Sequence, residues 1–544
     1  MLLFLLEYAA ICAGTWLLWK GLKGYVVNSP LDNIPGPPSD SWWAGNLRTM
    51  FNRHRGWKFH EDMDKFGAVV KIYGLFRERV LYIHDPKALH SIIVKDQHVY
   101  QKPDSSNVIT RLVLGPGLLG TSGDSHRKQR KMLNPVFSIK HMRSMTPIFY
   151  RITRKLHAVI EEKVRNGPNE VDILHWMGRT ALELIGQGGL GYSFDPLVAN
   201  VPNPFAEAVK NLVPSFSILI FFRPLLPFVE KIGTPAFRSW IVDHFPSERL
   251  RLIKNISDTI HSESIEILRD KRTAIQSGDQ AMIDKVGEGK DIMSILLKAN
   301  MMADADDKLP EDVLLGQMST FLFAAMDTTS NALSIIIHLL AQNQEVQDKL
   351  RKEVTAASVT HAAGDIPYDE LVDLPYLDAI CRETLRCHPP VASVSREAQE
   401  DIMLPLSSPI EGLDGKLMHE IFVPRGTNVV SSIMAANRNK KLWGDDAHEW
   451  KPERWLSPLP SAVTEAHMPG VYSNLMTFHG GVRSCIGFKF SQLEMKVVLA
   501  ILVRSFRFTL SDKEIVWNLG GIRYPTVGRS SNIPSMPIRV ELVE

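Results

Sequence analysis

The chain has 544 residues and a formal net charge of +2 at pH 7, a length that allows a large core and by itself suggests about three or four domains. The near-balance of charge gives no reason to expect nucleic acid as a partner. Four cysteines, at positions 12, 381, 387 and 485, are too few for a disulfide framework and favour a reducing compartment.

Residues 1–25 predict a membrane anchor. The run from Leu2 to Trp19 is apolar apart from Glu7, and a helix of that length reaches about 27 Å, close to the ~30 Å of a bilayer core. Lys20 and Lys23 follow this run and no lysine or arginine precedes it, which predicts a cytosolic body. A cleaved signal peptide is the alternative, but a basic start and a small-residue cleavage site are missing.

Residues 26–40 predict a stiff linker, because they contain the proline-rich run 35–38. The body is expected to span residues 41–544. Near its start, the β-rich runs 69–73 and 79–83 predict the two strands of a hairpin.

A basic helix is predicted over residues 124–131. The simple interpretation of Arg127, Lys128 and Lys131 is a solvated helix face. The alternative is a surface that docks an acidic protein.

An apolar run lies within residues 201–250, at 216–222 and on to Val229. It is too short to span a membrane, so a core segment is the simple interpretation. The polar residues 276–290 predict a loop.

A long helical pattern begins at Pro310, a residue suited to a first helical turn. Its apolar middle is interrupted by Asp327 and Thr328, and buried acids and hydroxyls are costly unless they have partners. From the residues alone, a second helix capped by one of these two side chains is favoured.

A further helix is predicted over residues 376–386. Glu383 and Arg386 lie three residues apart and so share a face. Taken alone, such a pair is a common surface ion pair worth a few tenths of a kcal/mol.

Residues 403–420 and 457–470 are rich in Pro, Gly and Ser and predict loops. From Phe506 onward the pattern predicts strands.

Residues 478–487 place Cys485 in a glycine-rich loop. Apolar residues spaced three or four apart from Phe490 predict a helix that follows, so Cys485 precedes a helix N-terminus, where a thiolate is favoured. Arg483 adds a cation. The cysteine could be a nucleophile, a metal ligand or an inert thiol, and a lone cysteine is most often a core residue. Zinc is disfavoured because no second Cys or His lies at zinc spacing, whereas haem iron accepts a single axial thiolate.

The loop resembles the haem-binding loop of cytochrome P450 enzymes, Phe-x-x-Gly-x-Arg-x-Cys-x-Gly. Its five fixed positions are filled by Phe478, Gly481, Arg483, Cys485 and Gly487. The motif is specific, and the resemblance covers essentially the whole chain. It implies a mainly α fold with small β-sheets (α+β), in which one large domain follows an N-terminal transmembrane helix. It also implies haem b with Cys485 as the axial iron ligand, and Phe478, Gly481 and Gly487 as part of the cofactor site.

The resemblance assigns propionate contacts to three arginines. The basic helix of the family usually carries Trp-x-x-x-Arg, where both residues reach a propionate. Arg130 matches the arginine, and His126 stands in place of the tryptophan. Arg483 of the loop and Arg396 are the other propionate ligands that the family implies.

The segment 324–330 resembles the oxygen-activating helix of the family, which favours one continuous helix over two. In that family the residue at Thr328 bonds iron-bound dioxygen, and the acid at Asp327 helps to relay protons. Ala325 replaces the usual glycine. The resemblance further implies a turn near residues 520–522 beside the substrate and the substrate-wall residues Phe321, Ala324, Ala325, Val391 and Val394.

The Glu383-x-x-Arg386 pair matches a family motif that is buried and meets an arginine from a later loop. That loop is present as residues 451–455, with Arg454 as the third member. The resemblance implies a structural triad and no catalytic role for it.

The implied activity is that of a monooxygenase, which inserts one atom of O2 into a lipophilic small molecule. Electrons are expected from NADPH through a separate NADPH-cytochrome P450 reductase, because the ~60 residues after Cys485 leave no room for a flavin domain. The basic helix is then expected to dock this reductase, and residues 201–250 to form a substrate roof at the lipid surface.

The chain looks like fungal microsomal members of the family, which implies the endoplasmic reticulum membrane and a terpenoid or other secondary metabolite as substrate. A haem-thiolate isomerase or dehydratase that acts on peroxides without a reductase is one alternative, which the Asp327–Thr328 pair disfavours. A non-enzymatic membrane haem sensor is the other.

Overall fold

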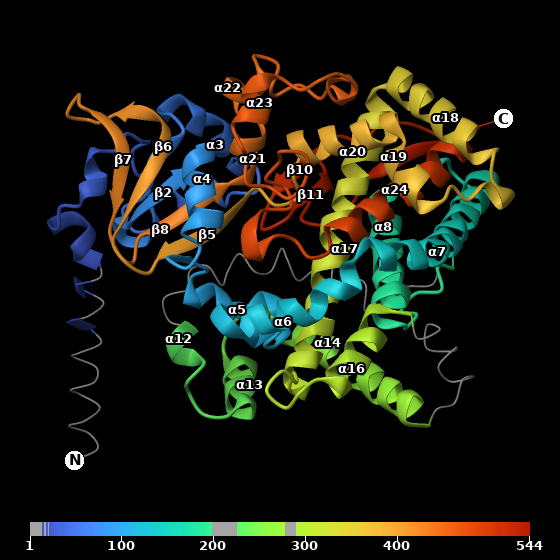
Figure 1. The fold of residues 1–544 in the computed structure, drawn as a ribbon, viewed down its shortest axis with the longest axis horizontal. Coiled ribbons are helices and arrows are strands. Elements are labelled where there is room, and N and C mark those ends of the chain that lie inside the picture. The colour runs from blue at the N-terminus through green and yellow to red at the C-terminus, as the bar shows by residue number, and fades with distance from the viewer. Residues whose placement is uncertain (1–13, 16–17, 20, 199–225, 278–289, 544) are drawn as a thin grey trace. The chain divides into compact units, whose positions relative to one another are not determined.

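The structure is a computed structural model and describes residues 14–15, 18–19, 21–198, 226–277 and 290–543. The chain divides into two compact units (Figure 1). The sheet unit comprises Met1–Pro103, Ala392–His448 and Pro460–Ser484, and the helical unit comprises Asp104–Val391, Glu449–Leu459 and Cys485–Glu544.

The sheet unit is built on a five-stranded sheet with the order β1-β2-β8-β5-β3. Strands β2 and β8 run parallel, and the other neighbours are antiparallel. Strands β6 and β7 form a separate antiparallel pair. The strands are β1 (Val69–Tyr73), β2 (Arg79–Ile83), β3 (Tyr100–Gln101), β5 (Ser393–Ala398), β6 (Ile402–Glu411), β7 (Leu417–Val423) and β8 (Asn428–Ser432).

Short helices surround this sheet: η1 (Pro30–Asn33), α2 (Leu47–Met50), α3 (Gly56–Asp62), η2 (Met63–Phe66), η3 (Leu75–Arg77), α4 (Pro86–His90), η4 (Ser91–Lys95), α21 (Ile433–Asn437), α22 (Lys440–Trp443), α23 (Ser461–Glu465) and η12 (Gly481–Arg483). Apolar residues of α2 and α3 pack on β1 and β2 to form the core. In this core the Tyr82 hydroxyl donates to Ser432 Oγ at 2.6 Å and lies 2.7 Å from His60 Nδ1.

The hairpin predicted at residues 69–73 and 79–83 is confirmed, with the same bounds. The loop predicted at 403–420 is wrong, because β6 and β7 pair through most of it. The pairing shifts register between Pro405 and Ile410. Proline has no N–H to donate, but an irregular two-stranded pair tolerates it, which is why proline content misled the prediction.

The helical unit contains most of the helices: α5 (Asp104–Leu114), η5 (Leu118–Gly120), α6 (Gly123–Leu133), η6 (Asn134–Phe137), α7 (Ile139–Asn166), α8 (Ile173–Leu184), η7 (Ile185–Leu190), α12 (Leu226–Val229), α13 (Pro235–His244), α14 (Glu248–Ser277), α16 (Ile292–Met302), α17 (Glu311–Gln342), α18 (Gln344–Ser358), η10 (Ala362–Gly364), α19 (Tyr368–Asp373), α20 (Pro375–Cys387), η11 (Pro452–Leu456) and α24 (Phe488–Ser505). Two small antiparallel sheets complete it, with the orders β4-β12-β9 and β10-β11. Their strands are β4 (Glu170–Asp172), β9 (Phe506–Leu510), β10 (Ile515–Leu519), β11 (Arg523–Val527) and β12 (Pro537–Leu542).

The helices predicted at 124–131 and 376–386, the helix after Cys485 and the strands after Phe506 are confirmed as α6, α20, α24 and β9–β12. The structure therefore has the mainly helical fold with small sheets that the sequence predicts.

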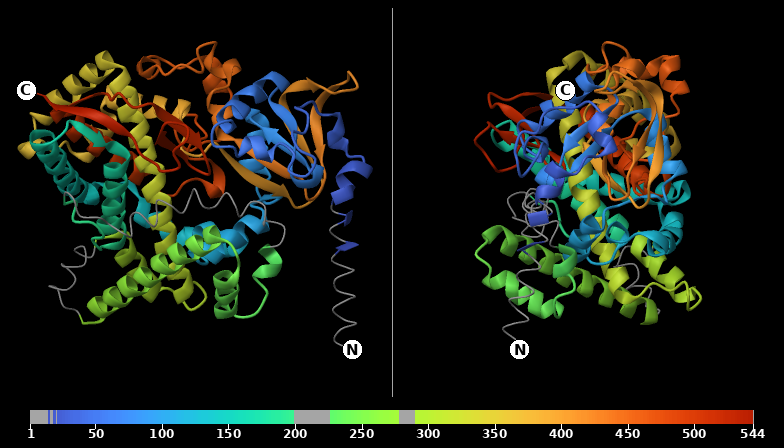
Figure 2. Two further views of the ribbon diagram at one scale, coloured as in Figure 1. Left: turned by 180° about the vertical axis from the view of Figure 1, so that it is seen from behind. Right: turned by 90° about the vertical axis from the view of Figure 1, so that its left-hand side faces the viewer.

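Helix α17 is the central element of the helical unit, and Figure 2 shows it running between the surrounding helices. It continues through Asp327 and Thr328, so the interpretation of two helices separated by a cap is wrong. Pro310 is its N-cap. Among the described residues, α17 is the one helix that is long and apolar enough to cross a membrane, but 78% of its apolar window is buried in the protein. That burial is typical of a core helix.

Three predicted segments lie partly outside the described residues: most of the anchor at 1–25, the first half of the roof at 201–250, and most of the loop at 276–290. Within the anchor segment, residues 14–15, 18–19 and 21–25 are helical.

Candidate active site

Cys485 lies two residues before Gly487, the N-cap of α24 (Phe488–Ser505). Among the described cysteines, Cys381 and Cys387 are buried and Cys485 is exposed. Protein atoms nevertheless crowd the thiol: burial raises the pKa of Cys485, although the Gly487 N–H and the positive charge of Arg130 lower it. The helix N-terminus does favour the thiolate, as predicted, but burial outweighs it, and Arg130 is the cation that acts on the thiol.

The glycine at 487 is not required by the protein's own packing. Its φ is −89°, which any residue adopts, and a Cβ there would meet only Phe137, at 3.9 Å. The space beside the thiol is therefore open on the Gly487 side. A glycine in this position suits the close approach of a bound group.

Helix α6 carries the two residues predicted to reach the same group. Arg130 is partly buried, which lowers its pKa while the nearby Cys485 raises it, and its Nε donates to Asn134 Oδ1 at 3.1 Å. His126 lies one turn earlier and is buried. Both residues thus belong to the unit that holds Cys485.

The cations predicted to dock a partner are partly engaged within the helical unit. Lys131 forms an ion pair with Asp307 at 3.0 Å, and Lys128 donates to the Asp306 carbonyl. Arg127 is exposed. The Lys131 pair is itself exposed and therefore weak, so these charges stay accessible.

The sheet unit holds the other two predicted arginines, Arg396 on β5 and Arg483 in η12. Arg396 is buried, and its guanidinium contacts the Ser395 carbonyl at 2.9 Å and His479 Nε2 at 3.3 Å. Burial, with repulsion from Arg483, lowers the pKa of Arg396 to about 10. Burial also lowers the pKa of His479 to about 3, so that the imidazole is neutral and compensates no charge.

Arg396 therefore has no carboxylate partner among the described residues, and a like charge lies nearby. Because a buried cation is costly without an anion, this arrangement fits an anionic ligand. His479 was not predicted from the sequence, and its one signal is its place inside the glycine-rich loop.

The glycine-rich loop is tightly packed within the sheet unit. Gly481 has a φ of +61°, and a Cβ there would lie 2.1 Å from the Ile93 carbonyl oxygen. A Cβ at Gly480 would lie 1.7 Å from the Pro469 carbonyl. Phe478 is buried and makes an edge contact with Tyr472, with ring centroids 5.5 Å apart. These glycines are thus required by the fold, in contrast to Gly487.

One face of α17 presents Phe321, Ala324, Ala325 and Thr328, which recur at three- and four-residue intervals. Phe321 is buried against Phe137, with ring centroids 5.7 Å apart, and the other three are partly exposed. The predicted oxygen-activating hydroxyl and three of the predicted substrate residues therefore share a face.

The Thr328 hydroxyl donates to the Ala324 carbonyl at 2.7 Å, a bond that leaves its lone pairs free to accept. Asp327 is buried, and its carbonyl accepts from Asn331 Nδ2 at 2.8 Å.

A contact that the sequence did not predict joins α17 to the helix after the cysteine. Thr329 Oγ1 lies 3.1 Å from Ser491 Oγ. Since Ser491 is in the first turn of α24, this bond sets the distance between the Asp327–Thr328 pair and the start of that helix. Only the hydroxyl run after Thr328 could have suggested such a partner.

Of the remaining predicted substrate residues, Val391 lies in the helical unit and Val394 on β5 of the sheet unit, both partly exposed. The turn at 520–522 joins β10 to β11.

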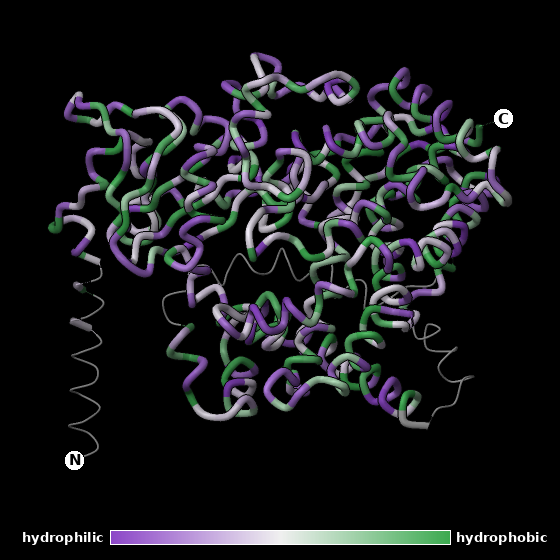
Figure 3. The backbone as a smooth tube through the Cα atoms, viewed as in Figure 1, coloured by the Kyte–Doolittle hydropathy of each residue, from purple (hydrophilic) through white to green (hydrophobic). Residues whose placement is uncertain are grey.

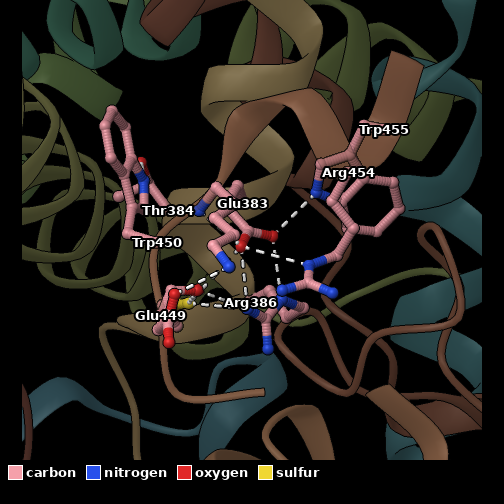
Figure 4. Close-up of polar contacts among 9 residues, drawn as sticks. Glu383, Thr384, Arg386, Glu449, Trp450, Arg454 and Trp455 are labelled. Atoms are coloured by element: carbon pink, nitrogen blue, oxygen red, sulfur yellow. Dashed lines mark hydrogen bonds and ion pairs between the residues drawn. The ribbon is translucent and has the colours of Figure 1, made fainter. Parts of the chain in front are cut away.

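The structure brings Glu383, Arg386 and Arg454 together (Figure 4). Arg386 binds the Glu383 carboxylate through Nε at 2.8 Å and Nη2 at 2.7 Å, and Arg454 Nε lies 3.4 Å away. The Lys451 N–H and Trp455 Nε1 also donate to this carboxylate, each at 2.9 Å. Burial alone would raise the pKa of Glu383, but these donors hold it below its usual value. The carboxylate is therefore ionised and fully bonded.

Comparison with known proteins agrees with this geometry. The family model described as Cytochrome P450 matches residues 35–520. The chain is 55% identical over 544 residues to cytochrome P450 monooxygenase 91 of Postia placenta, covering 100% of both chains. It is 48% identical over 545 residues to a ganoderic acid synthetase of Ganoderma lucidum, covering 98% of each chain. It is 36% identical over 543 residues to a P450 monooxygenase of Hericium erinaceus, covering 98% of this chain and 97% of that one.

The chain belongs to the cytochrome P450 family. It is a P450 monooxygenase, and the family uses haem as its cofactor.

Proposed function

We propose that Cys485 is the axial ligand of a haem b in this monooxygenase. The observation that carries the proposal is Cys485, the one exposed cysteine among the described residues, just ahead of the N-cap of α24, with Arg130 acting on it and open space at Gly487. Within the helical unit the residues fit the group, because Cys485 supplies one sulfur ligand and Arg130 supplies a cation for a propionate. By the family resemblance, Arg396 and Arg483 of the sheet unit are proposed to supply further cations for the propionates. When bound, haem supplies the redox chemistry that activates dioxygen.

The remaining cofactor contacts follow from the same proposal. His126 can donate one hydrogen bond to a propionate from its buried place on α6. Phe478 and Gly481 shape the loop that precedes the cysteine.

The proton supply is assigned to α17. Thr328 holds a proton at Oγ1, and its present bond to the Ala324 carbonyl must break before it can donate elsewhere. Asp327, buried next to it, is the group that returns a proton to the hydroxyl. Phe321, Ala324 and Ala325 on the same face, with Val391 and Val394, contact the substrate.

The substrate is proposed to be a lipophilic small molecule of the terpenoid class, which is oxidised or hydroxylated in secondary metabolism. Support comes from the relative named as a ganoderic acid synthetase. The electrons are proposed to come from NADPH through NADPH-cytochrome P450 reductase, docked in part by the exposed cations of α6. Attachment to the endoplasmic reticulum membrane through residues 1–25 is supported by their apolar sequence.

The reduced carbon monoxide difference spectrum of the wild type, beside that of Cys485→Ala, tests the axial ligand. A strongly red-shifted Soret band that disappears in the variant is expected. A band at the position of imidazole-ligated haem in undamaged protein would reject Cys485 as the ligand.

Two further experiments test the rest of the proposal. Turnover with peroxide alone, and none with reductase, would favour the isomerase or dehydratase, while failure to reduce oxygen with reductase present would favour the sensor.

Removal of residues 1–25 should weaken membrane attachment and leave haem bound. Loss of haem on that deletion would mean that the N-terminus is part of the fold.

A further inference from the structure

Exposed apolar side chains lie on the first helical residues of the sheet unit and on the loop that follows them. Helical residues Trp19, Leu22 and Val26 are 54%, 48% and 69% exposed. Their spacing of three and four places them on one helix face. Trp42, which is 73% exposed, is the most exposed tryptophan of the described residues. We call Trp19, Leu22, Val26 and Trp42 the tryptophan surface; Figure 3 shows the hydropathy of these segments.

The opposite helix face is seated on the sheet unit through two glycines. A Cβ at Gly24 would lie 2.4 Å from the Phe76 carbonyl oxygen, and one at Gly21 would lie 3.9 Å from the Phe76 ring. Only a residue without a side chain allows the helix to come so close at position 24. The glycine face therefore contacts the β1–β2 turn, and the apolar face points away from it.

Tyr25 adds further contacts between this helix and the rest of the sheet unit. Its hydroxyl donates to the Trp42 carbonyl at 2.8 Å. The guanidinium of Arg77 lies 5.0 Å from the Tyr25 ring and 5.4 Å from the Tyr73 ring, so that one cation is shared by two aromatic faces. We call the contacts of Gly24, Tyr25 and Arg77 the clamp. They join the helix to the body at residues that precede the proline-rich segment.

We propose that the tryptophan surface lies in the interface of a phospholipid bilayer and that the clamp makes helix and body enter it as one rigid piece. The proposal rests on the membrane attachment proposed above and adds a second lipid contact, made by the body itself.

Three observations favour lipid as the occupant. The exposed face continues directly from the apolar run Leu2–Trp19 of the sequence. Tryptophan is enriched where a membrane meets water, because its ring is apolar and its N–H is polar. Lys23 is exposed beside this face and suits the anionic headgroups of a cytosolic leaflet.

Contact with a bilayer would also remove these exposed apolar side chains from water, which is energetically favourable. Exposed aromatic and aliphatic side chains grouped on one side of a protein usually mark an interaction site. Lipid covers such a surface without a matching shape in the partner, which suits a helix face together with a loop residue.

Tryptophan quenching by lipid tests the contact in the full-length holoprotein. Vesicles of phosphatidylcholine and phosphatidylserine would contain a phosphatidylcholine brominated near the headgroup end of its acyl chain. Trp42→Phe should lower the bromine-quenched part of the emission by up to roughly one eleventh of the total emission, since the chain has 11 tryptophans. The matched control is Trp443→Phe, because Trp443 is 2% exposed in the same unit; its loss should lower total emission but leave the quenched part unchanged.

An unchanged quenched part in Trp42→Phe would overturn the lipid contact. A shift of Trp42 emission with protein concentration in the absence of vesicles would also overturn it, since a second copy of the chain would then cover the surface.

The clamp is tested with Gly24→Val, whose Cβ would collide with the Phe76 carbonyl. Gly14→Val is the control, because no atom lies within 4 Å of a Cβ there. Gly24→Val should still sediment with vesicles and keep its carbon monoxide spectrum, but the share of quenching that depends on Trp42 should fall. That share is read by comparing each valine variant with and without Trp42→Phe.

Equal Trp42 quenching in Gly24→Val and the unmodified protein would overturn the role of the clamp. Failure of the unmodified protein to sediment, or to give the spectrum, would instead contradict the proposed anchor or haem ligand, so the two failures are distinguishable.

Discussion

Replacement of Glu383 by Gln should destabilise the protein by about 3–5 kcal/mol, the usual cost of removing one partner from a buried ion pair. Both oxygens of the Glu383 carboxylate accept hydrogen bonds. Oε1 accepts from Arg386 Nη2 and the Lys451 N–H, and Oε2 accepts from Arg386 Nε and Trp455 Nε1. Wherever the glutamine places its NH2 group, a donor therefore faces a donor. Arg386, which is fully buried, also loses its ion pair with Glu383, which spans 2.7 Å.

Thermal and urea unfolding, followed by circular dichroism, measure this loss. With an unfolding entropy of about 2.1 cal/mol/K per residue, 544 residues give about 1.1 kcal/mol/K, so Tm should fall by about 3–4 °C. The control is Glu453→Gln, whose carboxylate is half exposed and lies 3.3 Å from Lys349; that exposed pair should contribute less than about 1 kcal/mol. Equal losses in the two variants would refute the argument that burial makes the triad strong.

The pH dependence provides an independent check. The folded pKa of Glu383 is below its ordinary 4.5, so its stabilisation is present above that pH and is lost as the pH falls through the folded pKa. The difference between wild type and Glu383→Gln should therefore shrink in acid. The double variant with Arg386→Met should recover part of the loss, because it removes the buried cation that has lost the Glu383 carboxylate.

Three other predictions concern the candidate site and the helices around it. Glu494 is fully buried on α24 with neither carboxylate oxygen bonded to any described residue, and burial raises its pKa well above 4.5. The folded protein therefore holds Glu494 in its neutral form. In urea unfolding of the wild type, the free energy of unfolding should fall by up to ~1.4 kcal/mol per pH unit as the pH rises from 4.5 towards the folded pKa, and Glu494→Gln should abolish this slope. Equal slopes in the two proteins would mean that the carboxyl is solvated. Thr328→Ala should uncouple the reaction, so that peroxide released per NADPH consumed rises, whereas Thr329→Ala should lower Tm without uncoupling; full coupling in the first variant would remove Thr328 from proton delivery. Arg127→Glu with Lys131→Glu should raise the reductase concentration needed for half-maximal NADPH consumption, most strongly at low salt, and unchanged coupling at low salt would reject α6 as a docking surface.

Much of the fold could be predicted because its signals are local. The hairpin at 69–73 and 79–83 follows from β-branched residues around a short turn, and α24 follows from a three- and four-residue apolar period after a glycine. The spacing of Glu383 and Arg386 placed both on one face. Their burial did not follow from spacing, because an exposed pair has the same pattern.

Features that depend on tertiary packing could not be predicted from the residues. The pKa of Cys485 is one example: the helix N-terminus and a cation favour the thiolate, but burial, which no local pattern reports, outweighs them. The bond between Thr329 and Ser491 is another, since it joins hydroxyls 162 positions apart. The proline content of residues 403–420 likewise led to the prediction of a loop where β6 pairs with β7. Whether a proline interrupts a sheet depends on the partner strand, which the local sequence does not report.

The proline-rich segment after the predicted anchor shows that a stiff sequence can also be a packed one. Its composition predicts a linker, yet Leu31 and Ile34 are only 2% and 1% exposed, and Asp32 pairs with Arg79 at 2.9 Å. A Cβ at Gly36 would lie 1.9 Å from the Lys71 carbonyl, so the segment follows β1 closely. Prolines lose little chain entropy when they are ordered, which makes a proline-rich segment inexpensive to fix against a sheet. The same residues that suggest a spacer therefore suit a segment packed on the sheet, and the contacts of Gly24 and Tyr25 ahead of it hold helical residues 21–26 against the same unit.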